Sequence, residues 1–330
     1  MKAIVFDHIG APADVLYLTD ISLPEIKDDE VLVRMVASSI IPGDFLFIQN
    51  MYPEPKKPVF PQQIGGNHGS GIIEKTGKDV RIPVGTFVFF TFYNSWAEYA
   101  IIPEKWLIEL PQAYPALKAS QMVNLITAWD LLELSGVKKD GWLVLTAGYS
   151  SISLLVAQFA NTLGIKIISI VRKLKTGDSH DTLHADAVID LSVSQQTLRS
   201  ELLQLTANQG VNGVVDNVGG KVLEELIRTT AFGSKVIING NMSVDKFELH
   251  NNDILFNGIE IKPYIYRYLL SPPKPEDKAS LEHIIRITSS RDFHVKIAVT
   301  HQLKDYELAV SASLYKSGDG KHVFIFPGDH

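Results

Sequence analysis

The sequence contains no cysteine among its 330 residues. This absence excludes disulfide bonds, cysteine-ligated zinc, iron–sulfur clusters and a cysteine nucleophile, and it fits a reducing compartment. The chain also lacks an apolar run of roughly 18 residues, which a membrane-spanning helix needs. The first residues, MKAIVF, have no signal or transit character. We therefore expect a cytoplasmic protein that does not bind a membrane.

Positive charge is also scarce. Lys and Arg number 31 against 37 Asp and Glu, so the formal net charge is −6. Because binding to a phosphate backbone needs a basic face, nucleic acid is not expected as a partner. The composition is 45% hydrophobic and 21% charged, which is typical of a globular protein with substantial cores. A small-molecule substrate is the expected ligand.

What is present divides into two patterns. Residues 1–118 contain short β-like runs separated by turn residues, with a Pro-rich loop at 51–66. From 119 to 265, apolar strand-like runs alternate with helical patterns, which predicts a parallel sheet covered on both faces. Residues 266–330 are too few for another α/β domain, so we expect them to return and complete the first one.

The segment VLTAGYSSISLLVAQFANTLGIKIISIVRK (144–173) has the layout of a dinucleotide-binding unit, but its loop lacks the G-x-G-x-x-G glycines. Ser150, Ser151 and Ser153 occupy the turn and the first helical positions. A diphosphate is held mainly by amide groups and the helix dipole, so serines at these positions are compatible with a cofactor site. The alternative is a capped helix without a ligand.

The strand after this helix ends in Arg172 and Lys173. An NAD site usually has a carboxylate there, for the ribose 2′-hydroxyl. A guanidinium suits a 2′-phosphate instead, so the residues predict NADPH as the cofactor. The alternative interpretation is a solvated charge pair at a strand end.

Several stretches together resemble the medium-chain dehydrogenase/reductase superfamily over nearly the whole chain. They are EVLVRMVASSIIPGDFLFIQNMYP, VNLITAWDLL, VVDNVGG and VIINGNMS. The resemblance implies a GroES-like β domain plus a Rossmann domain, a doubly wound parallel sheet. The domains would be 1–118, GroES-like and catalytic, 119–265, cofactor-binding, and 266–330, the return to the catalytic domain.

The zinc-dependent branch of that superfamily is not matched, because its metal sites need cysteines and a G-H-E motif. The corresponding region here reads GGNHGSG, and we interpret His68 as a hydrogen-bonded loop residue. His180 and His184 have helical i, i+4 spacing but no nearby carboxylate pattern, so no metal site is predicted. The stretch FIQNMYPEPKKPVFPQQIGGNHG is similar to the mitochondrial-type 2-enoyl thioester reductases. NADPH:quinone reductases share its Tyr-Pro element.

The resemblance places Tyr52 at the family's proton donor and Thr127 near the nicotinamide. It also aligns Asn217, Gly240 and Met242 with segments that pass the cofactor. Each has an ordinary structural alternative: a packing residue for Tyr52, a bond to its own helix for Thr127, a strand end for Asn217 and a turn for Gly240.

The resemblance therefore implies an NADPH-dependent reductase of activated C=C bonds, with enoyl thioesters as first substrates and quinones as the alternative. Ile41 replaces the family's asparagine, and serines replace the loop glycines. These departures keep open a catalytically silent, nucleotide-sensing protein. GIEIKPYIY is a plausible edge strand, and the family often pairs there, so a homodimer is expected.

Overall fold

The computed structural model describes residues 1–52, 56–193, 197–315 and 317–327. The chain forms two compact units, one of Met1–Val123 with Arg267–His330 and one of Asn124–Tyr266. The predicted boundaries after residues 118 and 265 lie beside those of the units. The roles assigned to the three predicted segments stay predictions.

The second unit is built on a six-stranded sheet in the order β11-β10-β9-β12-β13-β14. Every strand pair in it is parallel. The strands are β9 (Trp142–Leu145), β10 (Lys166–Val171), β11 (Ala187–Asp190), β12 (Val211–Asp216), β13 (Thr230–Ile238) and β14 (Glu260–Pro263). After β11 the chain returns to the middle of the sheet, where β12 pairs with β9. This is the doubly wound arrangement, in which ligands bind at the carboxyl ends of the strands.

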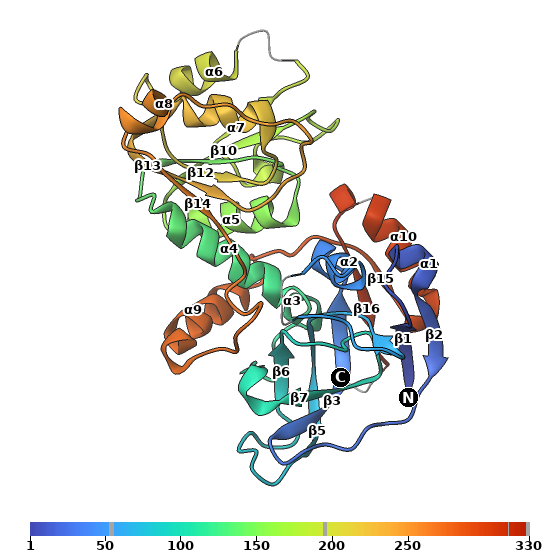
Figure 1. The fold of residues 1–330 in the computed structure, drawn as a ribbon. Coiled ribbons are helices and arrows are strands. Elements are labelled where there is room, and N and C mark those ends of the chain that lie inside the picture. The colour runs from blue at the N-terminus through green and yellow to red at the C-terminus, as the bar shows by residue number, and fades with distance from the viewer. Residues whose placement is uncertain (53–55, 194–196, 316, 328–330) are drawn as a thin grey trace. The chain divides into compact units, whose positions relative to one another are not determined.

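Helices connect these strands and lie over the sheet (Figure 1). The helical sequence patterns at 151–163 and 220–230 form helices, whereas the pattern near 178–184 forms only a single 3-10 turn. The helical sequence pattern at 195–208 forms a helix that begins at Leu198, and residues 195 and 196 lie outside the described residues. The elements of this part are α4 (Met122–Ser135), α5 (Ser151–Thr162), η2 (Asp181–Leu183), α6 (Leu198–Leu205), α7 (Gly220–Ile227) and α8 (Asn251–Leu255).

The first unit holds a largely antiparallel sheet in the order β15-β16-β3-β5-β6-β8, with β7 also paired to β3. A smaller sheet has the order β2-β1-β4. The strands of this unit that precede residue 124 are β1 (Lys2–Phe6), β2 (Tyr17–Asp20), β3 (Glu30–Ser39), β4 (Gln63–Ile64), β5 (Gly69–Thr76), β6 (Phe87–Phe90), β7 (Tyr99–Pro103) and β8 (Leu107–Glu109). The short helical segments are α1 (Pro12–Val15), α2 (Pro42–Ile48), η1 (Glu104–Trp106) and α3 (Ala116–Ala119).

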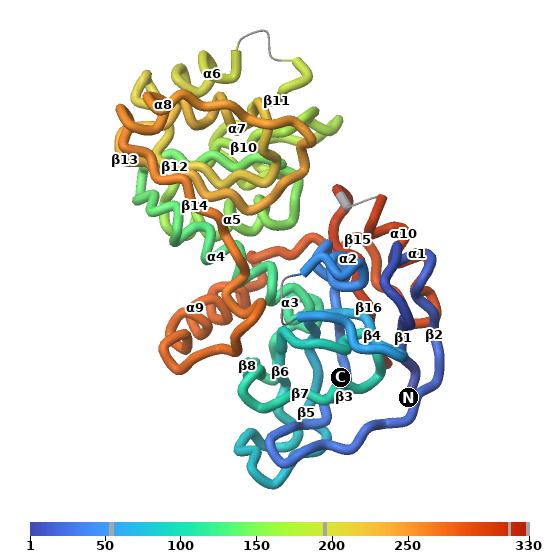
Figure 2. The backbone as a smooth tube through the Cα atoms, in the orientation of Figure 1, coloured from blue at the N-terminus to red at the C-terminus, as the bar shows by residue number. Residues whose placement is uncertain are grey.

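The C-terminal segment completes this sheet, as the sequence predicts. Its last strand, β16, pairs antiparallel with β3 through Val323↔Ser39 and its neighbours, and Figure 2 traces the red end of the chain back to the blue β3. Phe324 is fully buried in the same core as Met35. The elements of this segment are η3 (Pro275–Asp277), α9 (Lys278–Thr288), β15 (Ile297–His301), η4 (Leu303–Asp305), α10 (Tyr306–Tyr315), η5 (Ser317–Asp319) and β16 (Lys321–Ile325).

Within the described ranges, none of the helices combines the length and apolar character that crossing a bilayer requires. The predicted edge strand is also observed, since β14 is the last strand of the parallel sheet. Its pairing with a second copy of the chain stays a prediction.

Candidate functional site

The carboxyl ends of the central parallel strands are tied together by buried polar side chains. Thr146, directly after β9, donates to the Asp216 carboxylate over 2.7 Å and accepts from the Asn217 amide over 2.7 Å. The Asn217 side chain donates to the Thr146 carbonyl and accepts from Asn239. Asn217 is therefore fixed within the protein, and its predicted place beside a cofactor stays a prediction.

The serines of the modified loop have distinct partners. Ser150 is the N-cap of α5, and its Oγ accepts from the Ser153 amide over 3.1 Å. The Ser153 hydroxyl is buried and donates to the Thr146 carbonyl over 2.8 Å. This geometry gives the Ser153 hydroxyl partners inside the protein, and its predicted place in a cofactor site stays a prediction. The amides of Ser151 and Ile152, at the first two helical positions, are the donors that a diphosphate would meet.

Two glycines at this edge are required by close packing. A Cβ at Gly148 would overlap the Ser169 hydroxyl of β10. A Cβ at Gly240 would lie 2.5 Å from the Asn217 carbonyl oxygen and 2.9 Å from its Cα. Gly148 thus retains one function of the missing glycine fingerprint, the close approach of the loop to the neighbouring strand. Gly240 is explained by packing against Asn217.

Arg172 and Lys173 directly follow β10 and are exposed. The turn that carries them is held at Leu174, whose amide donates to Asp190 over 2.9 Å. Farther along, Tyr149 from the serine loop donates to Asp178 over 2.8 Å. Two accessible cations at the carboxyl end of the strand after α5 fit the ribose phosphate of NADPH.

Thr127 and Met242 complete the predicted residues of this unit. Thr127 is buried on α4 and lies 3.5 Å from the hydroxyl of Tyr264, which donates to Asp130 over 2.8 Å. Tyr264 thus packs against the helix. Met242 is 68% exposed and has no packing role in the core.

Tyr52 lies in the other unit, after α2. Its hydroxyl rests against the backbone of α2, because a Cβ at Gly43 would overlap it. The side chain is half-buried and packs against the core of that unit. Burial raises the pKa of the phenol above its ordinary value, and the nearby Asp44 carboxylate raises it further. The phenol therefore keeps its proton throughout the physiological pH range.

Asp44 is a fully buried carboxylate beside this tyrosine. It accepts hydrogen bonds from the Ile41 amide over 2.8 Å, the Asn67 amide over 2.9 Å and the Asn67 side chain over 3.1 Å. Burial raises its pKa to about 6 despite these donors. Asp44 is accordingly ionised at neutral pH and places a negative charge in the interior of the unit.

Lys56 is a buried cation next to this carboxylate, and only 4% of it is exposed. Its Nζ lies 5.5 Å from the ring centroid of Tyr52 and 5.4 Å from that of Tyr93, within the range of a cation–π contact. Desolvation lowers the pKa of Lys56 to about 8, although the charge of Asp44 opposes this shift. At neutral pH the ammonium is still mainly protonated.

His68 belongs to the same buried cluster. Its Nε2 lies 2.9 Å from Ser39 Oγ, and that hydroxyl donates to the Ser120 carbonyl. Desolvation, together with the charges of Lys56 and Lys321, lowers the pKa of His68 to about 3, so the ring is neutral. Its Nδ1 is buried without a hydrogen-bond partner among the described residues. The hydrogen-bonded loop histidine expected from the sequence is what the structure contains.

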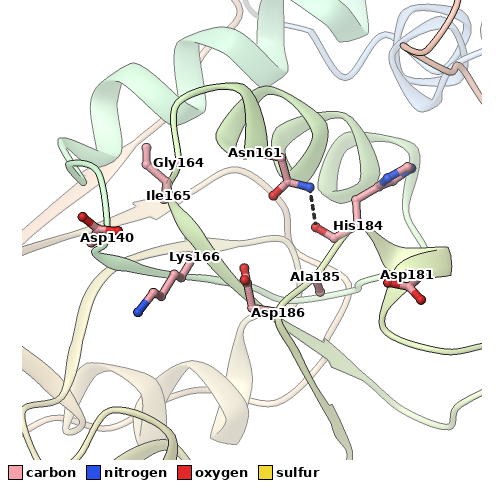
Figure 3. A pocket seen from close by; sticks show the side chains of 9 residues that line it. All are labelled: Asp140, Asn161, Gly164, Ile165, Lys166, Asp181, His184, Ala185 and Asp186. Atoms are coloured by element: carbon pink, nitrogen blue, oxygen red, sulfur yellow. Dashed lines mark hydrogen bonds between the residues drawn. The ribbon is translucent and has the colours of Figure 1, made fainter.

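A cavity of about 470 Å³ lies at the opposite end of the parallel sheet from the serine loop (Figure 3). Asp140, which precedes β9, and Lys166, the first residue of β10, line it together with Asp186. Asn161 donates to the His184 carbonyl at its rim over 3.1 Å. None of the predicted site residues faces it. The cavity is at the amino ends of the strands, where doubly wound proteins do not place their ligands.

Two family models match the chain, one within the first unit and one mostly within the second. "Alcohol dehydrogenase GroES-like domain" matches residues 27–112, and "Zinc-binding dehydrogenase" matches residues 151–283. The chain belongs to the zinc-independent medium-chain dehydrogenase/reductases. This membership confirms the predicted fold class, a GroES-like β domain plus a Rossmann domain.

Individual relatives of this dehydrogenase/reductase agree with that assignment. The mitochondrial enoyl-[acyl-carrier-protein] reductase of Homo sapiens is 25% identical over 326 residues, covering 95% of this chain and 86% of the relative. The Escherichia coli quinone oxidoreductase, solved with NADPH, has a TM-score of 0.84 at 20% identity and covers 99% of this chain and 100% of its own. The solved ETR1P/NADP/crotonyl-CoA complex has a TM-score of 0.84 at 21% identity, covering 98% and 99%.

The second matching model takes its name from zinc. The chain contains no cysteine. Across the residues that the structure describes, no group of three or more His, Asp or Glu side chains is arranged to hold a metal ion. The match of this model therefore supports the fold of the second unit and not the presence of a zinc site.

The structure gathers most of the predicted site residues of this dehydrogenase/reductase in one unit and places Tyr52 in the other. Sequence reasoning missed Asp44 and Lys56. The aspartate is part of the quoted IPGD segment, so the motif itself held a signal for it. The sequence held no signal for the burial of Lys56, because a lysine in a Pro-rich loop is ordinarily exposed.

Burial of the Lys56 charge should reduce the stability of the fold. The pKa falls from 10.5 to about 8 on folding, so the folded state binds the proton less well than the unfolded state. The cost is present in full below pH 8 and disappears as the pH rises toward 10.5. We predict that Lys56→Met raises the free energy of unfolding at pH 7 by about 1–3 kcal/mol, and by much less near pH 10.

Urea unfolding at the two pH values measures this difference. Lys304→Met, which removes an exposed ammonium of the same unit, serves as the control and should leave the free energy of unfolding within about 0.5 kcal/mol. A Lys56→Met variant that is less stable at pH 7 would show that the buried ammonium holds the fold together.

Proposed function

We propose that this protein is an NADPH-dependent reductase of activated C=C bonds, with enoyl thioesters as its substrates and Tyr52 as the proton donor. The observation that carries the proposal is a half-buried phenol in the GroES-like unit whose pKa is raised by burial. Such a group holds a proton at every physiological pH and releases it only to a strongly basic carbon or oxygen. A relative named as an enoyl reductase and a structural neighbour solved with NADP and crotonyl-CoA support the substrate class.

The residues at the carboxyl edge of the parallel sheet fit a dinucleotide. The N-terminus of α5 offers the amides of Ser151 and Ile152 to the diphosphate, and Gly148 keeps the loop close to β10. Arg172 and Lys173 are accessible for the 2′-phosphate. When bound, NADPH supplies a hydride to the β carbon of the substrate.

The protein's own contribution is the proton. In the reduction of a conjugated thioester, negative charge develops on the carbonyl oxygen and the α carbon of the substrate. Tyr52 then donates its hydroxyl proton to the α carbon, and the electron pair of the broken O–H bond stays on the phenol oxygen. Water returns a proton to that oxygen, which restores the acid for the next turnover.

Quinone reduction is the second candidate, because the solved Escherichia coli neighbour is a quinone oxidoreductase. A silent nucleotide sensor is the third, since Ile41 removes a polar group next to Asp44 and serines replace the loop glycines. Loss of NADPH absorbance with crotonyl thioester, a quinone or an alkenal separates these functions. NADPH binding without turnover of any acceptor would favour the sensor.

We also propose a homodimer formed through β14, whose outer edge has no strand partner among the described residues. Sedimentation measures the mass of the protein in solution and so distinguishes the homodimer from a monomer. The cytoplasmic location likewise stays a prediction, and the relatives are named as mitochondrial proteins.

Tyr52→Phe should lower the rate of enoyl reduction strongly, by about a hundredfold, because general acids typically contribute 10²–10⁴-fold. The dissociation constant for NADPH should change little, since the variant keeps the ring. Steady-state rates and fluorescence titration of NADPH measure the two quantities. Tyr315→Phe, at an exposed tyrosine of α10, is the matched control. Equal losses of rate and of NADPH affinity would remove Tyr52 from the acid role.

Arg172→Ala should raise the dissociation constant for NADPH by about tenfold or more, because it removes a charge-assisted hydrogen bond to phosphate. NADH lacks the 2′-phosphate, so its dissociation constant should stay nearly the same. Calorimetric titration of both nucleotides gives the ratio. Arg199→Ala, at an exposed arginine of α6 in the same unit, should leave the ratio unchanged. An unaltered ratio in Arg172→Ala would disprove the 2′-phosphate assignment.

A further inference from the structure

The buried charges around Tyr52 oppose the chemistry proposed for it. When the phenol gives up its proton, negative charge appears on the ring beside the Asp44 carboxylate, which already raises the pKa of Tyr52. Asp44 is fully buried, so water does not screen its charge. An acid in this position needs a compensating cation, and the described residues contain one in contact with the ring.

We propose that Lys56 is an electrostatic positioning residue for the proton-donating tyrosine: its buried ammonium, held between the rings of Tyr52 and Tyr93, stabilises the phenolate that proton transfer leaves behind. The proposal rests on the acid role of Tyr52 given under Proposed function. Lys56 makes no contact with the reacting carbon in this scheme and acts only through the phenol.

Three observations support the assignment. Lys56 is 4% exposed, which is rare for a lysine. Its Nζ lies within 5.5 Å of both ring centroids, and attraction between a cation and a phenol ring increases when the ring becomes anionic. Among the described residues no carboxylate forms an ion pair with Lys56 within 4 Å, and the carboxylate that acts on its charge is Asp44.

The charged and titratable groups around the ammonium come from several elements. Asp44 on α2 favours its protonated form, and Tyr52 and Tyr93 offer their ring faces. His68 is neutral, because its pKa is lowered to about 3. Lys321 on β16 is a second cation, whose pKa burial lowers. Since the pKa of Lys56 is lowered to about 8, its charge is present at neutral pH and is lost as the pH rises through this value.

Steady-state kinetics of Lys56 variants, alone and combined with Tyr52→Phe, test the proposal. Lys56→Met should lower kcat with crotonyl thioester by about tenfold and leave the NADPH KM unchanged, whereas Lys56→Arg keeps the charge and should retain most of the rate. The fall in kcat above about pH 8 should disappear in Lys56→Met. In a Tyr52→Phe background, Lys56→Met should cause little further loss, because there is no phenolate to stabilise. Lys304→Met is the control.

An equal loss from Lys56→Met in both backgrounds would overturn the proposal, and so would an unchanged kcat. These outcomes differ from failure of the proposed function, in which Tyr52→Phe itself leaves the rate unaltered or the wild-type protein reduces no acceptor. A structural role for Lys56 predicts lower stability for Lys56→Met together with lower activity. The electrostatic role predicts a more stable but slower protein.

A second measurement needs neither cofactor nor turnover. Difluorotyrosine placed at position 52 ionises nearer neutral pH than tyrosine, so fluorine NMR follows its titration in the folded protein. The pKa of this phenol should rise by about one pH unit in Lys56→Met. The same probe at position 315 should titrate identically in both proteins. An unchanged pKa at position 52 would show that the ammonium does not act on the ring.

Discussion

The environment of Tyr52 depends on one buried carboxylate. Asp44 is out of contact with water, and amide donors from Ile41 and Asn67 fix its two oxygens. These bonds join the start of α2 to the segment that precedes β5. A negative charge in the interior is costly unless a cation or several donors compensate it. The structure supplies both, and the neighbouring loop brings Lys56 and Tyr52 to the same place.

The serine loop shows how a fingerprint can change while its geometry persists. The glycines of a dinucleotide fingerprint serve a turn, a close approach and a packing contact. Here Gly148 retains the close approach to β10, and Ser150 caps the helix. Ser153 turns inward and fastens the helix to Thr146. The amides at the helix start are independent of side-chain identity, so the donors that we propose for a diphosphate are retained.

The sequence predicted the elements that have a repeating pattern of apolar residues. It did not predict the burial of side chains that depends on distant segments. Continuous apolar runs predicted the parallel sheet, because strands that are covered on both faces do not alternate apolar with polar residues. Ser150 was recognisable as a helix cap from its position alone. The burial of Lys56 was not predictable, since it involves Tyr93, which lies far from Lys56 in the chain. The inward hydrogen bond of Ser153 was equally unpredictable, because it joins the start of α5 to Thr146 only in the folded chain.

The GroES-like unit is discontinuous, and this has a consequence for how the protein is made. Its sheet is completed by β16, which pairs with β3 from the far end of the chain. A ribosome therefore releases the continuous stretch Asn124–Tyr266 while an interior strand of the other sheet is still missing. The nucleotide unit is able to fold during synthesis, whereas the unit that holds Tyr52 must wait for the last residues. During that interval the side of β3 that later pairs with β16 is an open strand edge, which can pair with another chain.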